Sequence, residues 1–168
     1  ENNPMITIEE FMTSDPCILH ETDSINDAWK IMTEKHIRHI PITDSDNQVL
    51  GIVTQRNVLA ATDPGASQTE ASDLGEAGSA TQLSEIMIRN VSIVHKKDSL
   101  RQAAVYLQEH KYGCLPVVSD DRLVGIITDS DFIGIAINLL EQVEMLEEET
   151  GVDDVTADVA FSELNESL

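Results

Sequence analysis

The chain has 168 residues, of which 41% are hydrophobic and only 4% aromatic, and its formal net charge at pH 7 is -21. This length fits one domain or two small ones with an aliphatic core. The charge argues against nucleic acids and anionic membranes as partners, because their phosphates would be repelled. No apolar stretch reaches membrane-spanning length. Cys17 and Cys114 form no C-x-x-C pair, so neither a disulfide framework nor a zinc ribbon is predicted, and a reducing cytoplasm is the expected location.

The first part of the chain predicts a β-α-β-β-α unit. Branched residues favour strands, and apolar residues at helical spacing after a Ser or Thr favour capped helices. In chain order, the expected elements are a short helix at 6–12 capped by Thr7, a strand at 17–19, a helix after Asp23-Ser24, strands at 37–43 and 49–53, and a helix at 57–61. Residues 62–82 carry four acids, no base and almost nothing apolar, which indicates a flexible linker between the repeats, with a regulatory lid as the alternative interpretation.

From residue 83 onward the same pattern returns. Met12 and Met87, Ser24 and Ser99, Ala28 and Ala103, and Pro41 and Pro116 are each 75 residues apart, while Gly51 and Gly125, Thr54 and Thr128, and Asn57 and Asp131 are each 74 apart. This spacing indicates a duplication. A unit of about 50 residues buries little surface alone. We therefore expect the two repeats, at 6–61 and 83–149, to pack about an approximate two-fold axis.

The end of the chain is acidic and contains no Lys or Arg after Arg122. Residues 132–149 predict a long helix with an apolar stripe that includes Ile133, Ile137 and Leu140. Residues 150–168 form an acidic tail with spaced apolar residues. Two interpretations of this tail stay open, a solvating segment and a segment that docks on a partner.

Each repeat ends one strand with the pattern Thr-x-x-(Asp/Asn), as Thr54-x-x-Asn57 and Thr128-x-x-Asp131. A strand end followed by a helix start leaves backbone N–H groups unpaired, and ligands collect at such places. The same pattern is close to a capping box, which needs no ligand. The two interpretations are compatible, and we treat this junction as the candidate site.

The paired stretches IRHIPITDSDNQVLGIVTQRNVL and YGCLPVVSDDRLVGIITDSDFI resemble tandem CBS domains, the Bateman module, over about residues 6–140. IRHIPI and CLPVV look like the CBS half of the acetoin-utilisation regulator family. The resemblance implies an α/β fold of two β-α-β-β-α repeats and a regulatory sensor of AMP, ADP or ATP, with Mg²⁺ as an accompanying ion. It also implies a homodimer and a regulated protein whose identity the sequence does not give.

Carried onto this chain, the resemblance places the ribose hydroxyls on Asp131, beside Thr128 and Ser130. It places the adenine near Ile93, Leu115 and Pro116. The phosphates fall to the basic residues of the first repeat, Arg38, His39 and Arg56, whose second-repeat counterparts are Gly113, Cys114 and Ser130. A weaker second site would use Thr54, Asn57, Ile40 and Pro41, because the Asn57 amide offers one acceptor oxygen where a diol needs two.

Other functions compete with nucleotide sensing. S-adenosylmethionine or a dinucleotide is an alternative ligand, although the basic set favours phosphates. A nucleotide-free interaction protein that works through its acidic tail is the alternative of another class. His36 and His39 straddle a helix end and a strand start, so no metal site is expected. No nucleophile–base pair stands out, and the chain is not expected to be an enzyme.

Overall fold

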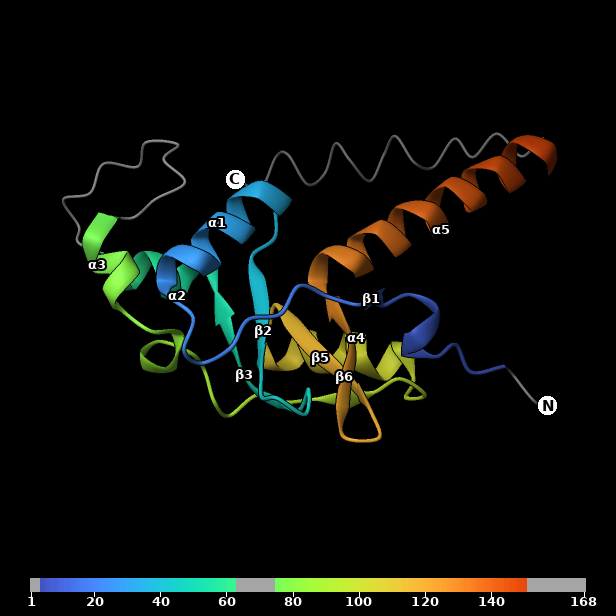
Figure 1. Ribbon diagram of the computed structural model, residues 1–168. Helices are drawn as coiled ribbons and strands as arrows, with labels where there is room; N and C mark the ends of the chain where they lie inside the picture. The colour runs from blue at the N-terminus through green and yellow to red at the C-terminus, as the bar shows by residue number, and fades with distance from the viewer. Residues whose placement is uncertain (1–3, 63–74, 151–168) are drawn as a thin grey trace. The chain divides into compact units, whose positions relative to one another are not determined.

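The computed structural model describes residues 4–62 and 75–150 as an α/β fold (Figure 1). Its elements are η1 (Ile8–Glu10), β1 (Thr13–Ser14), α1 (Ile25–Lys35), β2 (His39–Thr43), β3 (Val49–Thr54), α2 (Gln55–Ala61), α3 (Gly75–Ala80), η2 (Leu83–Glu85), β4 (Val94–His95), α4 (Leu100–His110), β5 (Cys114–Ser119), β6 (Arg122–Thr128) and α5 (Asp129–Thr150). Residues 1–131 form one compact unit, and the rest of α5 belongs to a second unit that is described by itself.

The central helix of each repeat starts and stops with the same local signals. Ser24 caps α1 by accepting from the Asp27 N–H at 3.2 Å, and Ser99 caps α4 by accepting from the Gln102 N–H at 3.3 Å. Each helix is followed by a residue in the left-handed conformation, His36 after α1 and Lys111 after α4, both with φ 54°. The duplication is therefore visible in the caps as well as in the sequence.

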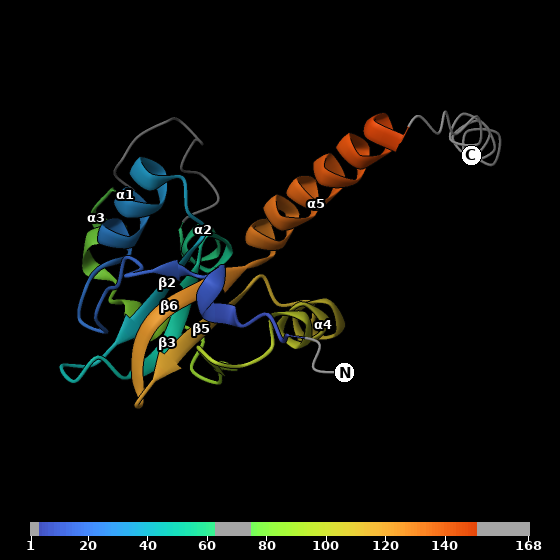
Figure 2. The ribbon, with the colours of Figure 1, turned by 90° about the vertical axis from the view of Figure 1, so that its right-hand side faces the viewer.

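The two repeats build equivalent sheets that share segments. In the first, β2 pairs antiparallel with β3, and bridges add Leu19 in parallel to Ile42 and Ile88 antiparallel to Ile52. In the second, the strand order is β1-β6-β5-β4, with β4 parallel to β5 and β1 antiparallel to β6. Each sheet thus takes its last segment from the other repeat. Figure 2 shows β2, β3, β5 and β6 between α1 and α4.

The core is aliphatic and also joins the repeats. Its main cluster packs α1 against the first sheet and includes two residues from the start of the second repeat, Leu83 and Met87. The buried residues of that cluster are Ile25, Ala28, Met32, Ile40, Ile42, Val53, Val58, Leu83 and Met87. Because part of this core comes from the second repeat, the first repeat does not complete its own hydrophobic interior.

Equivalent glycines let the shared segments approach closely. A Cβ on Gly51 of β3 would lie 2.5 Å from the carbonyl oxygen of Ile88, and one on Gly125 of β6 would lie 2.5 Å from Met12 Sδ and 3.0 Å from the carbonyl oxygen of Thr13. Real Cβ atoms do not come within 3.0 Å of a backbone oxygen without a shift of the chain. Glycine is therefore needed where a segment of one repeat crosses the sheet of the other.

Some expected elements differ from those observed. The strand expected at 17–19 is absent apart from the bridge at Leu19, and the two-residue strand β1 lies earlier, before Asp15 turns the chain with φ 49°. Within the expected linker 62–82, residues Gly75–Ala80 form α3. Residues 63–74 and the tail from 151 on lie outside the described residues.

The helix after the second site begins earlier than expected and runs as one element. It covers Asp129–Thr150, where the sequence predicted 132–149. Along its second-unit part, Ile133, Ile137 and Leu140 are exposed. None of the helices in the described residues is both long and apolar enough to cross a lipid bilayer.

Candidate functional site

The junction between β6 and α5 forms a complete capping box. The Thr128 N–H and hydroxyl donate to Asp131 Oδ2 at 2.8 and 3.1 Å, and the Asp131 N–H donates back to Thr128 Oγ1 at 3.3 Å. The second carboxylate oxygen, Oδ1, accepts no hydrogen bond from any described residue. The cap therefore orients Asp131 and leaves one oxygen able to accept from a ligand.

The equivalent junction between β3 and α2 uses an amide in the same geometry. The Thr54 N–H and hydroxyl donate to Asn57 Oδ1 at 3.1 and 2.7 Å, and the Asn57 N–H donates to Thr54 Oγ1 at 3.1 Å. Because the cap uses the amide oxygen of Asn57, only its NH₂ donor group remains for a ligand. The two junctions have the same structure but opposite hydrogen-bonding character toward a hydroxyl group.

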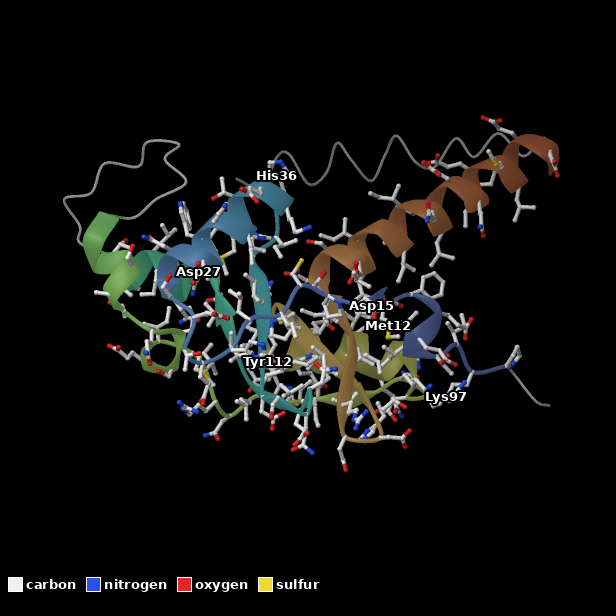
Figure 3. All side chains as sticks on the ribbon, viewed as in Figure 1. Met12, Asp15, Asp27, His36, Lys97 and Tyr112 are labelled. Carbon is white, nitrogen blue, oxygen red and sulfur yellow. The ribbon has the colours of Figure 1, made fainter. Side chains whose placement is uncertain are left out.

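A cavity of about 310 Å³ opens beside the Thr128 junction, and we call it the larger cavity. One wall comes from the end of β6 and the start of α5, and the opposite wall comes from the first repeat, from the segment around β1 and from the α1–β2 connection. Its lining residues are Thr13, Asp15, Pro16, Cys17, His36, Ile37, Arg38, His39, Ile126, Thr128, Asp129, Ser130 and Asp131. Asp15 and His36 are labelled in Figure 3.

The larger cavity brings together five residues that the sequence singles out, from both repeats: Arg38, His39, Thr128, Ser130 and Asp131. The other members of the expected site do not line it. Leu115 and Pro116 are buried within β5, and Ile93 is exposed elsewhere. Arg56 is exposed on α2, the helix of the other junction. The differences arise because the wall that faces Asp131 belongs to the first repeat and not to β5.

The sequence pattern did not single out the segment from Thr13 to Cys17 or the residues His36 and Ile37 for this cavity. The segment from Thr13 to Cys17 reaches the cavity because β1 pairs with β6, which is a contact between distant parts of the chain. One signal was available. Ile37 directly precedes Arg38, which the sequence had already selected.

A second cavity, of about 90 Å³, occupies the equivalent position in the other half, and we call it the smaller cavity. Its lining residues are His39, Ile52, Thr54, Ile88, Asn90, Val91, Ser92, Tyr112, Gly113 and Cys114. All except His39 are repeat counterparts of residues in the larger cavity, at spacings of 75 or 74. The expected second site is only partly here, because Thr54 lines this cavity whereas Ile40 and Pro41 are buried in β2 and Asn57 is not among its lining residues.

Aromatic residues flank the smaller cavity. The ring of Tyr106 stacks on that of His110 with centroids 4.0 Å apart, and His110 stacks on Tyr112 at 5.7 Å. The Tyr106 hydroxyl lies 2.6 Å from Ser92 Oγ, and both Ser92 and Tyr112 line the cavity (Figure 3 labels Tyr112). Both tyrosines of the chain therefore lie at or beside this cavity.

Charge is distributed unequally between the two cavities. The larger one contains Arg38, two histidines and the carboxylates of Asp15, Asp129 and Asp131, whereas the smaller one contains His39 but no Lys, Arg, Asp or Glu among its described lining residues. Burial lowers the pKa of His39, against an opposing effect of Asp129 and with a further lowering by Arg38. Burial also raises the pKa of the Cys114 thiol to about 12. Among the described residues, no group of three or more His, Cys, Asp or Glu side chains could hold a metal ion.

Comparison with known sequences gives one family. The model of the CBS domain matches residues 8–63 and 83–138. Among curated proteins, a homoserine O-acetyltransferase from Methanocorpusculum labreanum is 32% identical over 124 residues, which are 73% of this chain. The chain spans 23% of the length of that relative. The chloroplastic CBS domain-containing protein CBSX1 of Arabidopsis thaliana is 30% identical over 153 residues, covering 79% of this chain and 65% of that protein.

Solved structures give the same result. An acetoin utilization protein (AcuB) from Vibrio cholerae has a TM-score of 0.70 and 48% identity, covering 84% of this chain and 98% of that one. The CBS domain pair of MJ0100, in complex with 5-methylthioadenosine and S-adenosyl-L-methionine, has a TM-score of 0.66 and 26% identity over 80% of this chain and 98% of that one. CBSX2 in complex with AMP has a TM-score of 0.65 and 26% identity, with coverages of 79% and 97%.

Proposed function

Because this chain belongs to the CBS-domain family and carries two CBS domains in tandem, we propose that it is a regulatory module that binds an adenine nucleotide in its larger cavity. One observation carries the proposal. Asp131, whose Oδ1 accepts no hydrogen bond from a described residue, lines the same cavity as Arg38 and His39, although these residues come from different repeats. A nucleotide has the matching groups, hydroxyl donors on its ribose and anionic oxygens on its phosphate.

The ribose would bind at Asp131. Its capping box fixes the side chain before any ligand arrives, so little rotamer freedom is lost on binding. Oδ1 can accept from a ribose hydroxyl, and a hydrogen bond to a charged acceptor contributes about 1.5–3 kcal/mol. The larger cavity, at about 310 Å³, is at the lower end of the range of about 300–1,000 Å³ that is usual for ligand pockets.

The base would lie against the first repeat. Pro16, Ile37 and Ile126 supply apolar surface in the larger cavity, and Cys17 adds a soft, polarisable side chain. We propose these four residues for the adenine wall in place of Ile93, Leu115 and Pro116. The phosphate would then point toward Arg38 and His39, while Arg56 has no direct part in this site.

The choice of ligand rests on charge. CBSX2 forms a complex with AMP, and MJ0100 forms one with S-adenosylmethionine and 5-methylthioadenosine, so both kinds of adenosine compound bind to proteins of this fold. In this chain the larger cavity contains three carboxylates, of Asp15, Asp129 and Asp131, and also Arg38, whose guanidinium can pair with a phosphate but not with a cationic sulfonium. We therefore place AMP, ADP or ATP ahead of S-adenosylmethionine. We infer no catalytic role, and we expect the module to act as a cytoplasmic homodimer.

The test uses an Asp131→Asn variant, since the chain itself shows that asparagine makes the same cap at Asn57. The variant keeps the helix start and loses the acceptor oxygen. We expect its unfolding free energy to change by less than about 0.5 kcal/mol, while AMP affinity falls at least about tenfold. Isothermal calorimetry with AMP, ADP, ATP, adenosine and S-adenosylmethionine, beside urea unfolding, separates the two effects. Unchanged AMP affinity in this variant would refute the proposed ribose site.

Arg38→Ala and Arg56→Ala form a matched pair for the phosphate side. Both arginines are exposed, but only Arg38 lines the larger cavity. Arg38→Ala should weaken AMP at least about fivefold and adenosine hardly at all, whereas Arg56→Ala should leave both affinities unchanged. If no adenosine compound binds and a partner is captured only when residues 150–168 are present, the interaction protein is the better description.

A further inference from the structure

His39 is the one described residue that the larger and the smaller cavity share. It stands at the start of β2, where it pairs with Thr54 of β3. Its repeat counterpart, Cys114, pairs with Thr128 in the same way but lines only the smaller cavity. The duplication is therefore broken at this position, because a side chain of the first repeat takes part in both cavities.

The asymmetry has a visible cause at Gly113. This glycine is the repeat counterpart of Arg38, and a Cβ placed on it would lie 2.7 Å from His39 Nε2 and 2.9 Å from His39 Cε1. The imidazole edge thus occupies the space next to Gly113 that a larger side chain would fill. His39 and Gly113 both line the smaller cavity, whose volume is about 90 Å³ against about 310 Å³ for the larger one.

The charges around His39 differ on its two sides. The larger cavity contains Arg38 and Asp129, which both influence the charge of His39, whereas the smaller one is lined by the apolar side chains Ile52, Ile88 and Val91. A neutral ring suits the apolar side, and burial lowers the pKa of His39 accordingly. A phosphate beside Arg38 would add negative charge and favour the imidazolium form, which is costly to keep against an apolar wall.

Resting on the proposed function, we propose that His39 couples the two cavities. A phosphorylated ligand in the larger cavity draws the imidazole toward its phosphate and off Gly113, so filling the larger cavity enlarges the smaller one. Adenosine, which has no phosphate, fills the larger cavity without moving the ring. The coupling is reciprocal: if a ligand in the larger cavity changes the affinity of the smaller cavity for its own ligand, that second ligand changes the affinity of the larger cavity by the same factor.

The two cysteines report on the two cavities without any substitution. Cys17 lines the larger cavity, and Cys114 lines the smaller one, next to Gly113, where it is 7% exposed. The full chain is labelled with N-ethylmaleimide, and the rate at each cysteine is followed by peptide mass spectrometry. We expect AMP to slow labelling of Cys17 and to speed labelling of Cys114 at least about threefold. Adenosine should slow Cys17 and leave Cys114 unchanged.

Two variants test the assignment to His39. In His39→Ala the ring is gone, and in Gly113→Ala the new Cβ displaces it. The backbone at Gly113 is outside the left-handed region, so alanine is sterically acceptable there apart from the imidazole contact. In both variants Cys114 should be labelled faster than in the wild type, at a rate that AMP no longer increases. Either variant serves alone if the other does not fold.

Slower labelling of Cys114 in the presence of AMP would contradict the coupling. A ligand that only stabilises the fold slows labelling at every buried thiol. If calorimetry shows AMP binding while Cys17 and Cys114 both become slower, the coupling is wrong and the proposed function stands. If neither AMP nor adenosine gives a binding heat or protects Cys17, the proposed function fails and the coupling fails with it.

Discussion

At the scale of single residues, His39 connects the ionisation of this protein to its stability. Its pKa in the folded chain lies below the ordinary value of 6.5, chiefly because of burial. As the pH falls through that value, the unfolded chain takes up a proton at His39 before the folded chain does. The free energy of unfolding is therefore unaffected by His39 above about pH 6.5 and decreases because of it as the pH is lowered further.

The predicted pH effect is best measured as a difference. The many carboxylates of this acidic chain also titrate, but they are common to the wild type and to a His39→Gln variant. We expect wild-type stability, measured by urea unfolding between about pH 7.5 and pH 5, to decline relative to the variant as the pH decreases. Parallel stability curves, or a wild type that gains relative to His39→Gln in acid, would contradict a lowered pKa.

At the scale of elements, the paired glycines explain how the two sheets exchange segments. Gly51 in β3 is crossed by the backbone of Ile88, and a Cβ there would lie 2.5 Å from a carbonyl oxygen. Gly51→Ala should therefore destabilise the protein by about 1–3 kcal/mol, the usual cost of overpacking. The measurement is chemical unfolding followed by circular dichroism.

A glycine in α5 provides the control for that substitution. A Cβ on Gly134 would have no heavy atom within 4 Å beyond its immediate neighbours and the backbone of its own helix, so Gly134→Ala meets no obstacle. Alanine is the better helix former by about 0.5–1 kcal/mol. Gly51→Ala should therefore lower the free energy of unfolding, whereas Gly134→Ala should raise it. If both substitutions change it equally, the close approach of Ile88 does not decide the result at Gly51.

The elements that sequence analysis predicted well are those with local signals. Ser24 and Ser99 precede apolar helical patterns, and Thr128 follows a run of branched residues, so these helices and strands could be placed from nearby residues alone. Strand β1 could not be, because two residues carry no periodicity and the pairing partner of Thr13 is Ile126, far along the chain. Its position depends on how the repeats pack.

The same distinction applies to the candidate site. The capping boxes at Thr54 and Thr128 follow from a four-residue motif, and the structure shows both. The wall opposite Asp131 follows from packing, which placed Asp15, Pro16 and Cys17 in the cavity and left Leu115 in the core. The motif therefore identified Thr128 and Asp131, and the family resemblance added Arg38 and His39, whereas Asp15 and the apolar lining became visible only in three dimensions.

At the scale of the whole compact unit, the two repeats should unfold together. Each sheet contains a segment of the other repeat, and Leu83 and Met87 lie in the core of the first repeat. The Ile25 N–H also donates to the carbonyl of Thr81 at 3.0 Å. Because neither repeat can keep its core and its sheet when the other is lost, we expect one transition at equilibrium.

The aromatic residues allow this to be observed in the unmodified chain. The single tryptophan, Trp29, lies on α1 in the first repeat, and the two tyrosines, Tyr106 and Tyr112, lie in the second. Tryptophan fluorescence and the tyrosine near-ultraviolet signal should be lost at the same urea concentration. AMP at about 100 times its dissociation constant should move both midpoints together, by about 2.7 kcal/mol of unfolding free energy. Two separate midpoints, or a ligand shift seen by only one probe, would show that the repeats are independent domains, and binding across the cavity between them would then need another explanation.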